Sequence, residues 1–213
     1  MKPVETDELV IHFDARACVH ARRCVLGLPG VFDPDKQPWI QPGGTDTEAI
    51  TDVIQACPSG ALTFDRKNGA QETAPPANTV RLWENGPLEV RGDLRIEGHA
   101  PRHRALICRC GLTSNPPFCD NSHRDHFTAT SVPKLKEDKD VELESHGGPL
   151  EISARPNSPV MMTGNVEVTG SDGSRVARTE KSWFCRCGAS GNKPFCNGSH
   201  GKIGFQKEGT GEG

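Results

Sequence analysis

The sequence of 213 residues is poor in aromatic side chains and contains no long hydrophobic run. Aromatic residues make up 5% of the chain, so we expect a thin hydrophobic core and a contribution of bound metal to the folding energy. No apolar stretch approaches the ~18 residues of a membrane span, and the N-terminal segment lacks the basic and apolar regions of a secretory signal. We therefore expect neither a membrane protein nor a secreted one, and predict a cytoplasmic protein.

Motifs of common enzymes and of nucleic-acid-binding proteins are also absent. The sequence has no Walker phosphate-binding loop, no glycine-rich dinucleotide-binding motif and no nucleophile elbow. A formal net charge of −3 argues against a general nucleic-acid-binding protein. These absences predict a protein that is not an enzyme and that does not bind nucleic acid.

Cysteine, in contrast, is plentiful, with nine residues in the chain. The odd number, the missing secretory signal and the Cys-x-Cys pairs are not typical of a disulfide framework. In a cytosolic protein such cysteines more often bind metal or take part in redox chemistry.

A stretch without periodicity, NGAQETAPPAN at 68–78, predicts a linker between two domains. We expect an α+β fold, with a small first domain over residues 1–72 and a β-rich second domain over residues 79–213. The C-terminal segment 207–213 is expected to be disordered, and the charged segment 134–144 to be a solvated strand face or loop.

The first domain reads as strand, loop, helix and strand. Short apolar runs predict strands at 9–13 and 61–65. Between them, Thr45 is expected to cap a helix in a capping box with Glu48, and the helix is expected to stop at Pro58.

The second domain is a tandem duplication. Asn85-Gly86 lies between two alternating apolar runs and predicts a β-hairpin. The phrase GPLEV at 86–90 recurs as GPLEI at 148–152, and CRCGLTSNPPFCDNSH at 108–123 recurs as CRCGASGNKPFCNGSH at 185–200. Each copy is therefore expected to build one version of the same site.

Both cysteine motifs follow the spacing Cys-x-Cys-x8-Cys-x3-His. The predicted metal ligands are Cys108, Cys110, Cys119 and His123 in the first copy, and Cys185, Cys187, Cys196 and His200 in the second. Three thiolates and one imidazole form a legitimate zinc site. The close Cys-x-Cys pair favours an iron–sulfur cluster instead, because it places two thiolates on one iron and leaves the bridging sulfides on the other side.

These motifs resemble the signature C-x-C-x2-[S/T]-x3-P-x-C-D-G-[S/T]-x-H of the CDGSH (NEET) iron–sulfur proteins. Two positions depart from it, since Asn121 replaces a glycine and Asn197 replaces an aspartate, but neither is a ligand. The resemblance implies two [2Fe–2S] clusters, each with two cysteines on one iron and a cysteine and a histidine on the other. It also implies that the tandem copies form an intramolecular pseudo-dimer, so that the protein is a monomer with an internal pseudo-two-fold axis.

The three remaining cysteines are Cys18, Cys24 and Cys57. Their spacing, with Pro58 after the last, resembles a divergent mono-cluster ferredoxin domain over residues 8–65, although Ala21 replaces one cysteine of the common motif. The resemblance implies a [3Fe–4S] cluster on three thiolates, or a [4Fe–4S] cluster with His20 as fourth ligand. The alternatives are an exposed His20 without a metal role and three buried free thiols.

The sequence thus predicts an electron carrier with three clusters and a redox protein partner, either a reductase or an electron acceptor. A cluster donor to an apo-acceptor, a redox or iron sensor, and a zinc-stabilised interaction module are the alternatives. Four arginines lie beside the motifs and are expected to be solvated, or to screen the clusters or dock an acidic partner: Arg102, Arg104, Arg109 and Arg186.

The histidine ligands generate a first prediction. Because a proton competes with metal for the imidazole nitrogen, we expect clusters that are lost in mild acid. His123→Cys and His200→Cys should each make the respective cluster more resistant to acid, as measured by the decay of visible absorbance against pH. Unchanged acid lability in both variants would contradict the histidine assignment.

Overall fold

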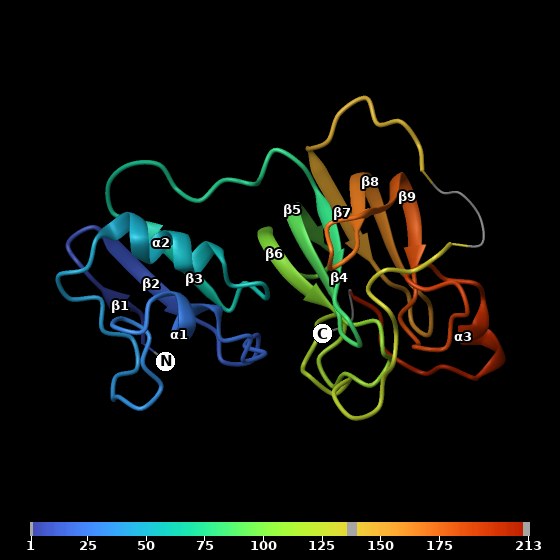
Figure 1. The fold of residues 1–213 in the computed structure, drawn as a ribbon, viewed down its shortest axis with the longest axis horizontal. Helices are drawn as coiled ribbons and strands as arrows, with labels where there is room; N and C mark the ends of the chain where they lie inside the picture. The colour runs from blue at the N-terminus through green and yellow to red at the C-terminus, as the bar shows by residue number, and fades with distance from the viewer. Residues whose placement is uncertain (1, 136–139, 211–213) are drawn as a thin grey trace. The chain divides into compact units, whose positions relative to one another are not determined.

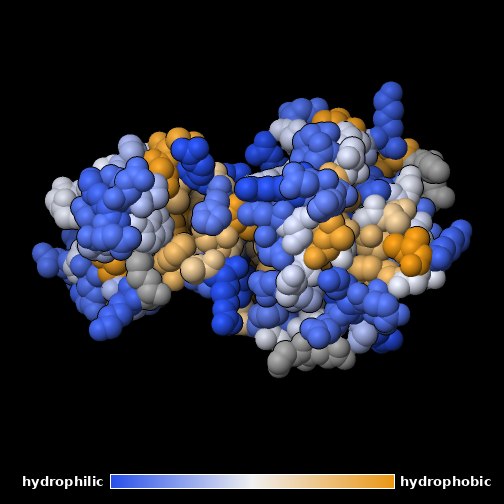
Figure 2. Space-filling view, turned by 90° about the horizontal axis from the view of Figure 1, so that it is seen from below, coloured by the Kyte–Doolittle hydropathy of each residue, from blue (hydrophilic) through white to orange (hydrophobic). Residues whose placement is uncertain are grey.

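The computed structural model describes residues 2–135 and 140–210, and the chain divides after Thr73 into two compact units (Figure 1). The predictions for 136–139, within the charged segment, and for 211–213, at the end of the tail, lie outside the described residues. No helix in the described ranges is long and apolar enough to cross a membrane. On the face shown in Figure 2, hydrophilic side chains dominate and hydrophobic ones form separate patches.

The first unit is a small antiparallel sheet with a helix packed on it. The strands lie in the order β1 (Val4–Glu5), β2 (Leu9–Phe13) and β3 (Leu62–Arg66), and the helices are α1 (Arg23–Gly27) and α2 (Thr47–Gln55). Ile50 and Ile54 of α2 are buried against Leu9, Ile11 and Leu62 of the sheet.

The start of α2 differs from the prediction. Asp46, and not Thr45, is the N-cap, because its carboxylate accepts a hydrogen bond from the backbone N–H of Ala49 at 3.0 Å. Glu48 does not close a capping box but pairs with Arg66 of β3 at 2.8 Å. The helix ends at Gln55, two residues before Cys57, so the sheet and the helix together place this cysteine.

The second unit is built on one six-stranded sheet. Its strands are β4 (Thr79–Leu82), β5 (Leu88–Ile96), β6 (Arg102–Ile107), β7 (Pro149–Ser153), β8 (Val160–Thr169) and β9 (Arg175–Phe184), followed by the short helix α3 (Ser199–Lys202). The expected hairpin at Asn85-Gly86 is present, since β4 and β5 pair as antiparallel neighbours. The helices among the described residues have only five, nine and four residues, so the fold is mostly β, which corrects the predicted α+β class.

The two copies of the duplication build the same three-stranded meander. In the first copy β4, β5 and β6 pair in antiparallel order, and in the second β7, β8 and β9 do so. Val80 of β4 faces Val90, and Ile152 of β7 faces Met162, so equivalent residues lie 72 positions apart. The matched phrases GPLEV and GPLEI are therefore not equivalent: the first begins β5, whereas the second forms β7, the counterpart of β4.

The copies are joined by parallel strand pairs. β4 of the first copy pairs with β8 of the second, and β7 of the second pairs with β5 of the first. In the first contact, Val80 lies opposite Val168. In the second contact, Ile152 lies opposite Ile96, and these two residues are the equivalents of Val80 and Val168. The two contacts between the copies therefore have the same register.

Asn78 ties these strands together at the junction. Its side chain is buried, and its Nδ2 donates to the carbonyl oxygens of Gly148 and Asn165 at 3.0 and 2.9 Å. Its Oδ1 accepts from the backbone N–H of Asp93 at 3.2 Å. One amide thus satisfies backbone groups in both copies.

Asn78→Ala should therefore destabilise the second unit. Removing the three hydrogen bonds of this buried amide is expected to lower the free energy of unfolding by about 3 kcal/mol, at roughly 1 kcal/mol each. Denaturant unfolding measures this, with the same change at exposed Asn68 as the control. Equal stability of the two variants would contradict the joining role of Asn78.

Candidate metal centres

The first motif begins where β6 ends and folds back on the same strand. The backbone N–H of Cys108 donates to Pro117 at 2.8 Å, and that of Cys119 donates to Leu106 at 2.8 Å. This bridge brings the four predicted ligands of the copy together. The Sγ atoms of Cys108 and Cys110 lie 3.5 Å apart, and Cys119 Sγ lies 3.4 Å from His123 Nδ1.

The second motif repeats this geometry at the end of β9. The backbone N–H of Cys185 donates to Pro194 at 2.7 Å, and that of Cys196 donates to Trp183 at 2.8 Å. The Sγ atoms of Cys185 and Cys187 lie 4.0 Å apart. Cys196 Sγ lies 3.4 Å from Nδ1 of His200, which α3 carries.

In each copy the donors therefore come in two pairs. Two thiolates on one tetrahedral metal ion, at bond lengths of about 2.3 Å, lie about 3.8 Å apart, and a thiolate and an imidazole lie about 3.5 Å apart. The observed pairs match these separations. Among the residues that the structure describes, no three Cys, His, Asp or Glu side chains converge on the position of one ion. Two pairs of donors fit a binuclear centre better than a single zinc ion.

Burial controls the protonation of these ligands. It raises the pKa of Cys119 to about 12 and also raises the pKa of Cys185, so that both thiols need a metal to deprotonate at neutral pH. A hydrogen bond from the Cys110 thiol lowers the pKa of Cys108, aided by backbone N–H groups. Burial and then the Arg124 cation lower the pKa of His123, which keeps its imidazole in the neutral form that binds metal.

The two departures from the signature have different consequences. Asn121 has a φ of 74° and its counterpart Gly198 a φ of 82°, and asparagine is one of the few residues that tolerate this left-handed conformation. Asp120 accepts from the backbone N–H of Ser114 at 2.7 Å as well as from Ser122. Asn197, the counterpart of Asp120, accepts only from Ser199 among the hydrogen bonds of the described residues, so the second loop lacks this cross-link.

Three of the four arginines expected in solvent are buried, namely Arg104, Arg109 and Arg186. Arg109 and Arg186, the middle residues of the two Cys-Arg-Cys sequences, are 1% and 3% exposed. Arg109 donates to the carbonyl oxygens of Gly86 and Trp83 in the β4–β5 turn. Arg186 donates to the carbonyl oxygens of the equivalent residues of the β7–β8 turn, Ser158 and Arg155, and to that of Glu208. The sequence offered one signal for this role, the recurrence of arginine at the same place in both copies.

The segment after each motif also binds the hairpin turn of its own copy. Asn85 and Ala129 exchange two hydrogen bonds of 2.9 Å. Asn157 and Lys207 exchange an equivalent pair of 2.8 and 2.7 Å. Thr210 is buried and donates to Glu97 at 2.8 Å. The expectation of a disordered tail is therefore wrong for residues 207–210.

The two motifs pack back to back through their glycines. A Cβ atom on Gly111 would lie 3.0 Å from the carbonyl oxygen of Cys187, and one on Gly188 would lie 2.5 Å from that of Cys110. Both glycines have a left-handed φ, of 84° and 77°. Each position therefore requires glycine for two reasons, the lack of space for a Cβ atom and the left-handed φ. The close approach brings the two Cys-x-Cys pairs against each other.

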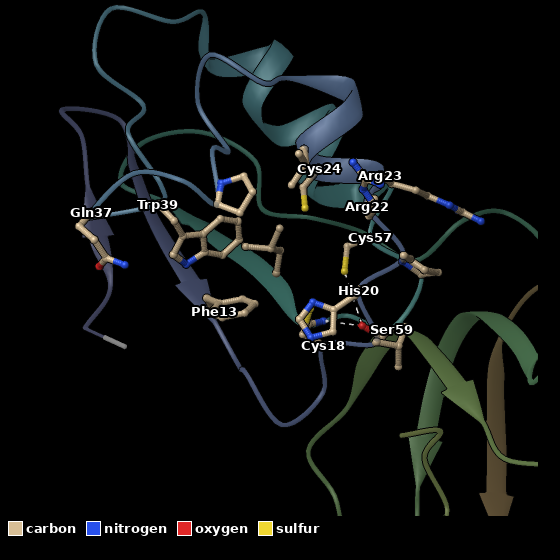
Figure 3. Close-up of a pocket in the computed structure, with 17 residues that line it drawn as sticks. Phe13, Cys18, His20, Arg22, Arg23, Cys24, Gln37, Trp39, Cys57 and Ser59 are labelled. Carbon is tan, nitrogen blue, oxygen red and sulfur yellow. Dashed lines mark hydrogen bonds between the residues drawn. The ribbon is translucent and has the colours of Figure 1, made fainter. Parts of the chain in front are cut away.

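In the first unit, the three remaining cysteines and His20 line one cavity of about 490 Å³. Figure 3 shows Cys18, Cys24 and Cys57 around this hollow, with His20 beside Cys18 and the rings of Phe13 and Trp39 on another wall. Burial raises the pKa of Cys18 and Cys24. The thiols lie on several walls of the cavity, as a cubane-type cluster requires. They do not converge on the position of one metal ion.

The loop between Cys18 and Cys24 has an unusual backbone. His20 and Arg22 have φ values of 52° and 62°, which are uncommon for residues other than glycine. The Cys57 side chain lies 3.7 Å from the hydroxyl of Ser59. This loop, the start of α1, the segment that follows α2 from Cys57 and the start of β3 all line the cavity.

Both sets of candidate sites lie within regions of the chain that match known families. The chain matches the family model for a divergent 4Fe-4S mono-cluster over residues 4–67, and the model for an iron-binding zinc finger of CDGSH type over residues 85–124 and 157–201. It is 34% identical to the uncharacterized protein YjdI of Escherichia coli strains K12 and O157:H7 over 61 residues, 29% of this chain and 80% of that protein. Both resemblances noted in the sequence are confirmed.

The back-to-back packing predicts that a change in one motif disturbs the other. Gly188→Ala places a Cβ atom against the Cys110 carbonyl and should lower metal binding at both sites. The control is Gly173→Ala, because Gly173 also has a left-handed φ, of 84°, but nothing lies within 4 Å of an added Cβ. The measurement is metal per chain by elemental analysis, and equal content in the two variants would count against the packing.

Proposed function

Because the chain belongs to the CDGSH-type iron-binding family and, in its first unit, to the divergent 4Fe-4S mono-cluster family, we propose that it is an electron carrier with three iron–sulfur clusters. The observation that carries the proposal is the pairing of donors in the twin motifs. Two thiolates on one side and a thiolate with an imidazole on the other suit the two irons of a [2Fe–2S] cluster.

In this proposal the first copy binds one iron through Cys108 and Cys110 and the other through Cys119 and His123. The second copy uses Cys185 and Cys187, then Cys196 and His200. A bound cluster supplies a one-electron redox centre, and a neutral imidazole in place of a thiolate raises its reduction potential. The chain contributes dry surroundings, since Cys108 and Cys185 are 2% and 1% exposed.

We also propose that the two copies act as a pseudo-dimer within one chain. The support is the equal register of the two parallel strand contacts and the reciprocal packing of Gly111 and Gly188. A single chain then contains both halves of the paired site, and the protein works as a monomer.

For the first unit we propose a ferredoxin-like role, with Cys18, Cys24 and Cys57 holding three irons of a [4Fe–4S] cluster. His20 is then the fourth ligand. It lines the same cavity, and imidazole is an established iron ligand, whereas the other polar side chains on that lining belong to arginine, glutamine and serine. In this proposal His20 supplies the ligand that the common motif has as a cysteine at the position of Ala21.

The fourth-ligand assignment predicts the cluster type of a variant. His20→Ala should convert the first-unit cluster to a [3Fe–4S] form, and His20→Cys should retain four irons. Electron paramagnetic resonance of the oxidised and reduced protein distinguishes the two forms. The control is His12→Ala, since the ring of His12 faces Asp65 at 2.7 Å outside the cavity. A [4Fe–4S] signal that persists in His20→Ala would contradict the assignment.

The electron-carrier proposal is tested on the whole protein purified without oxygen. About eight irons with matching sulfide, little zinc, and absorption between roughly 400 and 550 nm that bleaches on reduction are expected. Repeated cycles of reduction and reoxidation should leave the iron content unchanged. Transfer of intact clusters to an apo-ferredoxin, faster than their simple decay, would instead favour a cluster donor. Stoichiometric zinc would reject both.

A further inference from the structure

The two cysteine loops differ in charge although they carry the same set of metal donors. Residues 185–204 of the second loop include three Lys or Arg and no Asp or Glu, whereas the equivalent residues 108–127 include two of each kind. Asp125 lies two residues after the histidine of the first loop, and Lys202 lies two residues after that of the second. Both side chains are exposed. The second loop is therefore basic, and the first has no net charge.

The second site is also more open to solvent beside its histidine. Cys119 of the first loop is buried at 5% exposure, while its counterpart Cys196 is half-buried. Lys202, the last residue of α3, is exposed, and Ile203 after it is 54% exposed. A Cβ atom added at Gly201 would meet nothing within 4 Å. Another molecule can therefore approach the thiol and the histidine of the second loop closely.

A cation beside an apolar side chain on an open surface fits a protein partner with an acidic face. Protein interfaces combine apolar contacts with a charged rim, and complementary charge speeds the encounter of the two partners. Ile203 supplies the apolar contact and Lys202 supplies the charge. A [2Fe–2S] cluster with three thiolate ligands is itself anionic. Lys202 offsets that charge at the second site, whereas Asp125 adds to it at the first.

Resting on the proposed clusters, we propose that the surface formed by Lys202 and Ile203 is the docking site for a redox partner with an acidic face. The partner is a protein in which carboxylates surround the redox group. It exchanges one electron with the second cluster, and one of the two centres is oxidised as the other is reduced. The first cluster, with Asp125 at the equivalent position, exchanges electrons with the second and not directly with the partner.

The probe for this site is a plant-type [2Fe–2S] ferredoxin with an acidic surface, reduced in advance. Its reduction potential lies below that of a histidine-ligated cluster, so that it donates electrons to the oxidised protein. Stopped-flow absorbance gives the second-order rate constant for this reaction. Lys202→Asp should lower the constant about tenfold at low ionic strength, and the difference should nearly disappear at high salt, where the charges are screened. Lys202→Arg retains the charge and should react as fast as the wild type.

The control makes the same change of charge at another exposed position. Arg81 lies opposite Thr169, at the end of β8 away from Val160, which pairs with Phe184 just before the second motif. Arg81→Asp should therefore leave the rate constant within about twofold of the wild type.

Three results would contradict the proposal or its premise. An unchanged rate constant in Lys202→Asp with its clusters retained, or an equal loss in Arg81→Asp, would overturn the docking site. Self-association of the wild type that Lys202→Asp abolishes would assign the surface to a second copy of the chain and would also overturn it. A wild-type protein without iron and sulfide would instead refute the proposed function.

Discussion

The parallel pairing of β4 with β8 and of β7 with β5 is the contact on which the second unit depends. Each copy by itself is a three-stranded meander with a cysteine loop at one end. Joining the meanders in equal register places the two loops back to back, so that Gly111 lies on Cys187 and Gly188 on Cys110. Two cysteine loops that are far apart in sequence are thereby brought into contact.

Local patterns predicted the parts of this protein that depend on neighbouring residues. The ligand spacings, the hairpin at Asn85-Gly86 and the strands of the first unit all rest on short stretches of sequence. The sequence predicts the helix cap one residue too early, because Thr45 and Asp46 are both good caps and only the folded backbone selects between them. Periodicity therefore located the elements, and the hydrogen bonds defined their ends.

Features that depend on distant contacts were not predictable in the same way. The burial of Arg109 requires a hairpin turn some twenty residues earlier in the chain, and the order of residues 207–210 requires Asn157. The similarity of GPLEV and GPLEI predicts the wrong pair of equivalent strands, because β4 and β7 occupy equivalent places in the sheet but have few identical residues. Charge and composition suggest solvent for Arg109 and for residues 207–210, whereas contacts with the hairpin turn of the same copy bury Arg109 and order this segment.

The central claim is that paired donors hold two irons in each motif, beside a third cluster in the first unit. Mössbauer spectroscopy of the protein enriched in ⁵⁷Fe tests it most directly. The account predicts that half of the [2Fe–2S] iron lies at sites with four sulfur ligands and half at sites with mixed sulfur and nitrogen ligands, together with a separate cubane-type component. A single class of mononuclear iron, or binuclear iron with sulfur ligands alone, would contradict it.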